Sequence, residues 1–165
     1  GYFKCHNKNG KLVVETPEGA LIEFDFPRSS KTPHLCLTDY FGDDDVVAFQ
    51  SVTVGNKVAE IIENWNKEDK YTDAYYLHGL AVEVAEALAS WINEKIKSEL
   101  SLEKGGLRYS WGFPSCPDVF QHHLVWKLLK AEESGMTLTE SGQIVPEQST
   151  AAIVVHHPEA QYFVL

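Results

Sequence analysis

The sequence predicts an α+β fold: a mixed, largely antiparallel bent sheet with a long central helix and a second helix. Strand-like patterns lie near both ends of the chain, helical spacing dominates its middle, and short turns join neighbouring strands. No Gly-x-Gly-x-x-Gly turn follows a strand, which argues against a dinucleotide-binding α/β fold. The 165 residues, of which 44% are hydrophobic, are enough for one domain with a substantial core, so we expect residues 1–165 to form a single domain.

The first part of the chain has mainly strand character. Ile22, Phe24 and Phe26 alternate with charged residues, which predicts one buried and one solvent-exposed face. The segment Thr16-Pro17-Glu18-Gly19 has the composition of a turn that joins this strand to the one before it. The strands expected here are residues 11–15, 20–26, 34–40 and 46–54.

The middle of the chain has helical spacing, which begins near Lys57 and is interrupted by the polar residues 66–70. An apolar stripe then predicts a central helix packed on several sides. The stripe consists of Leu77, Ala81, Val84, Leu88, Trp91 and Ile92. A second helix is expected from Pro117 to about Ser134, where Gly135 ends it. The last strands are expected at residues 137–141, 151–155 and 161–165.

Charge and composition exclude several classes of protein. The formal net charge of −10 argues against binding to nucleic acid or to an anionic membrane surface, because no basic surface is available. No apolar run has the length of a membrane span. Three cysteines without a close pair favour a reducing cytoplasm. The opening residues Gly1 to Lys4 do not resemble a natural N-terminus, so we expect a C-terminal piece of a longer chain.

The segment from Arg108 to Asp118 combines one arginine, two prolines, a glycine and three aromatic residues. Proline restricts the backbone, and Gly112 permits close approach of another group. The planar fork of Arg108 suits a carboxylate, so this segment predicts a site for a small anionic or zwitterionic ligand. A structural loop with one surface arginine is the alternative.

Two other kinds of site were considered from the residues. The pairs His122-His123 and His156-His157 do not converge well on one ion, because neighbouring side chains on a helix or strand diverge, and we expect no metal site. Cys116 has no evident general base beside it. A hydrolase that uses Asp39, His157 and Cys116 is therefore a second alternative, without a supporting triad spacing.

Several blocks, in order, resemble one known family. Besides Arg108-x-x-x-Gly112-Phe113-Pro114-x-Cys116-Pro117, they are residues 37–41, 79–89, 135–141 and 157–163. Together they are similar to the activation (S-adenosylmethionine-binding) domain of cobalamin-dependent methionine synthase, over about residues 34–165, with residues 30–165 the well-matched part. The region before residue 30 resembles the family poorly, Phe113 stands where the family usually has tyrosine, and His78 where it tends to have lysine.

The resemblance implies a ligand and a set of contacts. Arg108 would pair with the carboxylate of S-adenosylmethionine. Acidic side chains would accept hydrogen bonds from its ammonium or ribose, backbone groups would contact adenine, and aromatic rings would face adenine or the sulfonium. The residues that the resemblance assigns to this site are Asp39, Glu86, Arg108, Ser110, Gly112, Phe113 and Tyr162.

The resemblance also implies a function. S-adenosylmethionine would supply the methyl group that converts oxidised cob(II)alamin to methylcobalamin, with an electron from a flavodoxin-like donor. The domain would thus be a module of a cytoplasmic 5-methyltetrahydrofolate–homocysteine methyltransferase, inactive in isolation. No Asp-x-His-x-x-Gly signature is present, so another domain would carry cobalamin. The alternative is a stand-alone activator, or an S-adenosylmethionine-sensing module, for a separate corrinoid protein.

Overall fold

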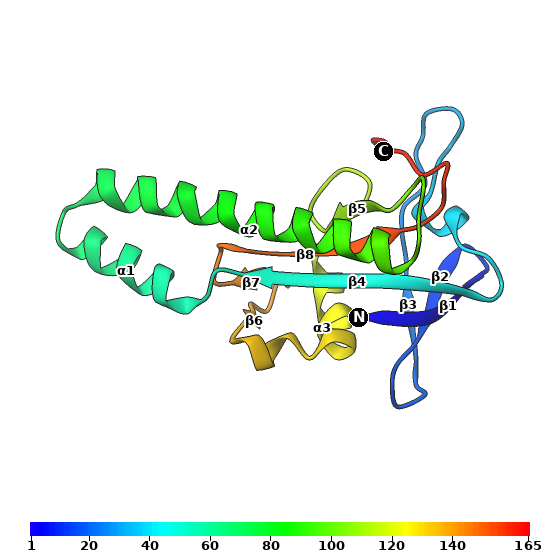
Figure 1. Cartoon of the computed structure of the whole chain (residues 1–165), viewed down its shortest axis with the longest axis horizontal. Coiled ribbons are helices and arrows are strands. Elements are labelled where there is room, and N and C mark those ends of the chain that lie inside the picture. The colour runs from blue at the N-terminus through cyan, green and yellow to red at the C-terminus, as the bar shows by residue number, and fades with distance from the viewer.

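The computed structural model describes all residues from Gly1 to Leu165 and confirms the predicted α+β class. Six strands form an antiparallel sheet in the order β3-β2-β1-β4-β8-β5 (Figure 1). These strands are β1 (Tyr2–Lys8), β2 (Lys11–Glu15), β3 (Leu21–Phe24), β4 (Asp45–Thr53), β5 (Leu107–Ser110) and β8 (Ser149–Val155). The strands β6 (Thr137–Leu138) and β7 (Ile144–Val145) form a separate two-stranded hairpin, which is not hydrogen-bonded to the six-stranded sheet.

The hairpin of β2 and β3 confirms the alternation expected for residues 22–26. Ile22, Phe24 and Phe26 are buried, and Leu12 pairs with Phe24 across the two strands. The turn between them closes through the Thr16 hydroxyl, which accepts a hydrogen bond from the Ala20 amide at 3.1 Å. Strand β1 was not predicted from the sequence, although its buried Phe3 and Cys5 alternate with the exposed Tyr2 and Lys4 in the period-2 spacing of a strand.

Two expected strands are wrong. Residues 34–40 contain instead the 3-10 helix η1 (Leu37–Tyr40), in which Leu37 and Tyr40 are both buried. A 3-10 helix places residues three apart on the same side, so the spacing of Leu37 and Tyr40 is compatible with a helical turn as well as with a strand. Residues 161–165 pair with no strand, because side-chain hydroxyl groups rather than backbone amides bond to their carbonyls.

The long helical region divides as predicted, into α1 (Asn56–Lys67) and α2 (Tyr71–Glu99), with Asp69 at a positive φ of 60° between them. The expectation that α2 is packed on several sides is wrong. It lies along one face of the sheet over β4 and β8, and its first half extends past the sheet beside α1 (Figure 1). The face toward the sheet is formed mainly by small residues, because alanine lets a helix approach a sheet closely. The buried residues of α2 are Ala74, Ala81, Ala85, Ala89 and Ile96.

The second predicted helix is three short helices rather than one. They are η2 (Val119–Gln121), α3 (His122–Leu129) and η3 (Ala131–Ser134). The break lies at Lys130, whose left-handed backbone, with a φ of 52°, ends α3. The Asp118 carboxylate caps the start by accepting a hydrogen bond from the Phe120 amide at 3.0 Å. None of the helices combines the length and apolar character that a membrane span needs.

The main core lies between the sheet and α3. Phe49 of β4 is completely buried there, with its ring 5.2 Å from Phe24 and 6.1 Å from Trp111 between ring centroids. Val125 and Trp126 of α3 belong to the same cluster. Trp111 thus anchors the start of the 108–118 segment in the core, which gives that segment a rigid base.

Candidate functional site

The candidate site begins on the edge strand β5. Arg108 and Ser110 lie on this strand opposite Val154 and Ala152 of β8, so the expected loop at 108–118 is a strand over its first three residues. After Trp111 the chain makes a tight turn, in which the Gly112 amide donates to the Cys116 carbonyl at 2.8 Å. The edge strand and the turn together hold the backbone of the predicted binding segment in one conformation.

Gly112 has a positive φ of 90°, a conformation that side-chain-bearing residues rarely adopt. A β-carbon at this position would also lie 3.3 Å from Cγ1 of Val119. Glycine is therefore required here by the turn itself, independently of any ligand.

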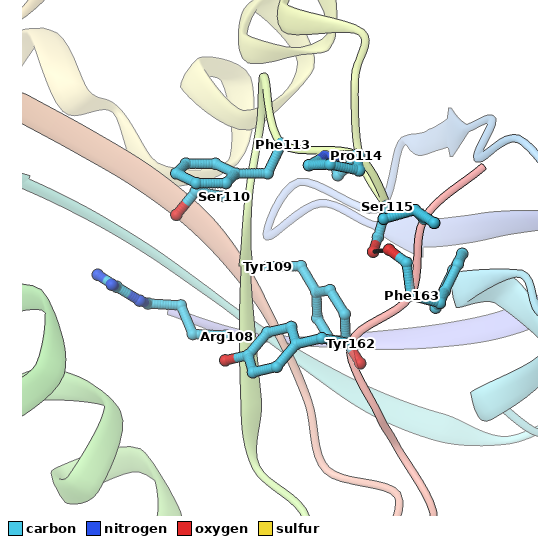
Figure 2. Close-up of a pocket in the computed structure, with 10 residues that line it drawn as sticks. Arg108, Tyr109, Ser110, Phe113, Pro114, Ser115, Tyr162 and Phe163 are labelled. Carbon is cyan, nitrogen blue, oxygen red and sulfur yellow. Dashed lines mark hydrogen bonds between the residues drawn. The ribbon is translucent and has the colours of Figure 1, made fainter.

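A pocket of about 410 Å³ opens beside β5 (Figure 2). This volume falls in the range typical of sites for small molecules. One wall is β5 and the following turn, and the opposite wall is the segment 161–165. The lining residues are Arg108, Tyr109, Ser110, Phe113, Pro114, Ser115, Cys116, Tyr162, Phe163 and Val164.

Side-chain hydroxyls hold the second wall in place. Tyr109 donates to the Gln161 carbonyl at 2.8 Å, and Ser29 donates to the Val164 carbonyl at 2.7 Å. Ser115 donates to the carbonyl between them, that of Phe163. Burial, followed by the nearby tyrosines, raises the pKa of Tyr109, so its phenol stays protonated and able to donate.

Four of the seven residues predicted from the sequence line this pocket: Arg108, Ser110, Phe113 and Tyr162. Gly112 lies in the adjoining turn. Figure 2 shows the Arg108 side chain extending away from Tyr109 toward the neighbouring helix, and Tyr162 with its ring beside that of Tyr109. The structure therefore brings five of the predicted residues together around one pocket.

Glu86 of α2 reaches the site through Arg108, whose Nη2 donates to the Glu86 carboxylate at 2.5 Å. The other terminal nitrogen of Arg108, Nη1, is buried and has no hydrogen-bond partner. A buried guanidinium N–H without an acceptor costs free energy, so Arg108 has unused capacity for an anionic group.

Asp39 lies outside the pocket lining. Its carboxylate is held by both terminal nitrogens of Arg28, one of them at 2.7 Å. Arg28 also donates to the His34 carbonyl at 2.7 Å. Arg28 was not predicted from the sequence, because it lies eleven residues from Asp39 in a loop without periodic spacing.

The other sites considered from the sequence find no support in the geometry. Asp39 pairs with Arg28, the His157 Nδ1 accepts from the Glu159 amide at 3.1 Å, and Cys116 is 1% exposed, so these groups form no triad. No group of three or more His, Cys, Asp or Glu side chains is arranged to hold a metal ion.

We expect Cys116 to react slowly with thiol reagents in the folded protein. Burial, and then the charge of Asp118, raise the pKa of its thiol, and the thiolate is the reactive form. Iodoacetamide at about pH 8 should label Cys116 at least roughly 100-fold more slowly than it labels a free cysteine, and denaturation should abolish this protection. Peptide mass spectrometry measures both rates, and rapid labelling of the native protein would contradict the buried, protonated thiol.

The fold and the pocket together define an α+β domain with a pocket at the edge of an antiparallel sheet, lined by an arginine and aromatic rings. The family model described as "Vitamin B12 dependent methionine synthase, activation domain" matches residues 20–165. The chain belongs to this family, which confirms the resemblance and extends it upstream of residue 30.

Two curated relatives carry the name methionine synthase. The protein from Mycobacterium tuberculosis (strain ATCC 25618 / H37Rv) is 33% identical over 196 residues, and that from Mycobacterium leprae (strain TN) is 30% identical. Each match includes 99% of this chain but only 16% of the relative's length.

A solved structure has the same fold. It is a crystal structure of the MetH reactivation domain bound to AdoHcy, with a TM-score of 0.88 and 22% sequence identity. The match covers 99% of this chain and 59% of that one. It confirms the arrangement of a largely antiparallel sheet with helices.

Proposed function

We propose that this chain binds S-adenosylmethionine and supplies its methyl group for reductive reactivation of cob(II)alamin to methylcobalamin in a cobalamin-dependent methionine synthase. The observation that carries the proposal is Arg108, which has one nitrogen paired with Glu86 and the other buried without a partner beside a 410 Å³ pocket. Membership of the activation-domain family supports it, as does the AdoHcy bound to the solved neighbour.

The residues around the pocket fit the parts of this ligand. Arg108 would turn its unpartnered Nη1, which is buried in this structure, to the carboxylate, while Glu86 would receive the ammonium group. Phe113, 64% exposed, and Tyr162, 67% exposed, offer aromatic faces to the adenine or the sulfonium. The backbone at Ser110 would contact the adenine edge.

Gly112 and Asp39 do not line the pocket, so each would contribute to ligand binding in another way. Gly112 lets the turn bring its backbone close to the adenine. Asp39 would accept from the ligand with the lone pairs that Arg28 leaves free, since a carboxylate has about four acceptor sites. Its contribution requires the ligand to extend beyond the pocket lining.

The bound ligand supplies an electrophilic methyl group on a sulfonium, so the chain's own residues bind and orient rather than donate a nucleophile. Cys116, the pocket's one thiol, has a raised pKa and is buried, and it therefore does not compete for the methyl group.

The partners in this proposal are a cobalamin-binding domain, of the same or another chain, and a flavodoxin-like electron donor. The methyltransferase activity would then belong to a larger cytoplasmic protein, with the present chain inactive by itself, because the chain spans 16% of the methionine synthases it matches. The alternative, which would bind the same ligand, is a stand-alone activator or an S-adenosylmethionine-sensing module for a separate corrinoid protein.

Calorimetric titration tests the ligand assignment. S-adenosylmethionine and S-adenosylhomocysteine should both bind, because both have the amino-acid carboxylate that Arg108 is proposed to bind. The control is 5′-methylthioadenosine, which lacks the ammonium and carboxylate groups, and we expect it to bind at least about tenfold more weakly. Equal affinity for all three compounds would contradict the role of Arg108, and no binding of any of them to the folded chain would overturn the proposal.

A further inference from the structure

The outward face of α2 has large apolar side chains that nothing in this chain covers. Leu80, Val84, Leu88 and Trp91 are exposed by 63, 39, 40 and 64%. Their spacing of three to four residues places them in one stripe along the helix. Contiguous exposed apolar surface of this kind marks an interaction site rather than ordinary solvent-exposed surface.

The stripe continues into a groove of about 440 Å³ beside the helix, because Trp91 belongs to both. Gln50 of β4 also lines this groove and is 4% exposed, yet neither its Oε1 nor its Nε2 has a hydrogen-bond partner. Both atoms are themselves buried, so Gln50 forms part of the floor of the groove beneath the helix.

The groove is separate from the proposed ligand pocket. Trp91 and Glu86 are five residues apart on α2, which places them about 140° apart around the helix axis. Glu86 faces Arg108 and the pocket, so the apolar stripe faces another side of the molecule. This inference therefore does not depend on the proposed function.

The surface area of the chain agrees with an uncovered face. A compact protein of 18.5 kDa is expected to expose roughly 8,200 Å². This chain exposes 9381 Å². The excess of roughly 1,200 Å² is larger than the roughly 800 Å² that one partner buries in a standard interface, so it can accommodate one uncovered docking face.

We propose that the α2 stripe and its groove dock an amphipathic helix from another part of a longer polypeptide of this family. Proteins of this family have further chain that could supply such a helix, because the matched region is 59% of the solved MetH chain and 16% of the curated methionine synthases. The helix would present apolar residues at i, i+3, i+4 and i+7 to the stripe. Helix α2 has five acidic residues and two lysines, so the flanks of the docked helix are neutral or basic.

A synthetic peptide pair tests the groove. The probe is an 18-residue leucine–lysine peptide with its leucines on one helical face, and the control has the same composition with the leucines spread around the helix. Binding is followed by tryptophan fluorescence, to which the exposed Trp91 contributes. We expect the probe to bind at least about tenfold more tightly than the control, because both have the same charge and only one has an apolar face.

Matched variants locate the binding. The double variant Leu80→Asn, Leu88→Asn should lose at least about tenfold in affinity for the probe, because each removes apolar contact area. The variants Leu21→Asn and Phe120→Asn change exposed apolar residues outside the stripe and should bind as the parent does. Circular dichroism confirms that all of them fold. Equal binding of the two peptides, or equal losses in all variants, would overturn the proposal, and so would self-association that the double variant abolishes, since the occupant would then be a second copy.

Discussion

Replacing Arg108 by alanine is expected to weaken binding of S-adenosylmethionine by roughly 30-fold or more. The estimate assumes that a hydrogen-bonded ion pair contributes about 2 kcal/mol, and a tenfold change corresponds to about 1.4 kcal/mol. The buried Nη1 of Arg108 has no other acceptor, so no alternative contact in the chain replaces the lost one. Isothermal titration of the parent and the variant measures the change.

Two further variants distinguish the planar guanidinium geometry of Arg108 from its positive charge alone. Arg108→Lys keeps the cation but loses the planar pair of donors, so its affinity should lie between those of the parent and Arg108→Ala. Arg28→Ala removes the chain's other arginine, which lies outside the pocket lining, and should weaken binding by less than about fivefold. An equal loss in Arg28→Ala and Arg108→Ala would show that overall charge, rather than a carboxylate contact at Arg108, controls affinity.

Replacing Phe49 by alanine should produce the largest loss of stability, about 3–5 kcal/mol in the free energy of unfolding. Phe49 is completely buried and its ring lies beside those of Phe3, Phe24 and Trp111, so the substitution leaves a cavity that these rings cannot readily fill. Equilibrium urea denaturation measures the change.

The matched control for Phe49 is Phe120, which is 59% exposed. Phe120→Ala should change the free energy of unfolding by less than about 0.5 kcal/mol, because little buried area is lost. A loss below about 1 kcal/mol in Phe49→Ala would show that the core around β4 repacks, contrary to the tight ring contacts.

Local patterns predicted much of the fold because each element has its own periodicity. The alternation at Ile22, Phe24 and Phe26 and the polar break before α2 both reflect contacts within a few residues. The packing of α2 could not be predicted in this way. Its apolar stripe indicated a buried helix, yet alanines form the contact with the sheet, and large side chains such as Leu80 and Trp91 face outward.

The candidate site was partly predictable for a similar reason. Arg108, Ser110, Gly112 and Phe113 are close in sequence, so one motif identified them together. Contacts between distant segments were not predictable from spacing. Arg28 holds Asp39, and Ser29 and Ser115 hold the 161–165 segment; these contacts depend on the tertiary fold.

The way in which residues 161–165 are attached determines how the protein should lose ligand binding on heating. Their carbonyls accept hydrogen bonds from three side chains, and no backbone–backbone hydrogen bond uses their amides, so no ladder of backbone bonds holds them to the sheet. Segments held in this way open at a lower free energy than core strands. The pocket would therefore lose its second wall while β4 and β8 are still paired, and the loss of ligand binding would precede global melting.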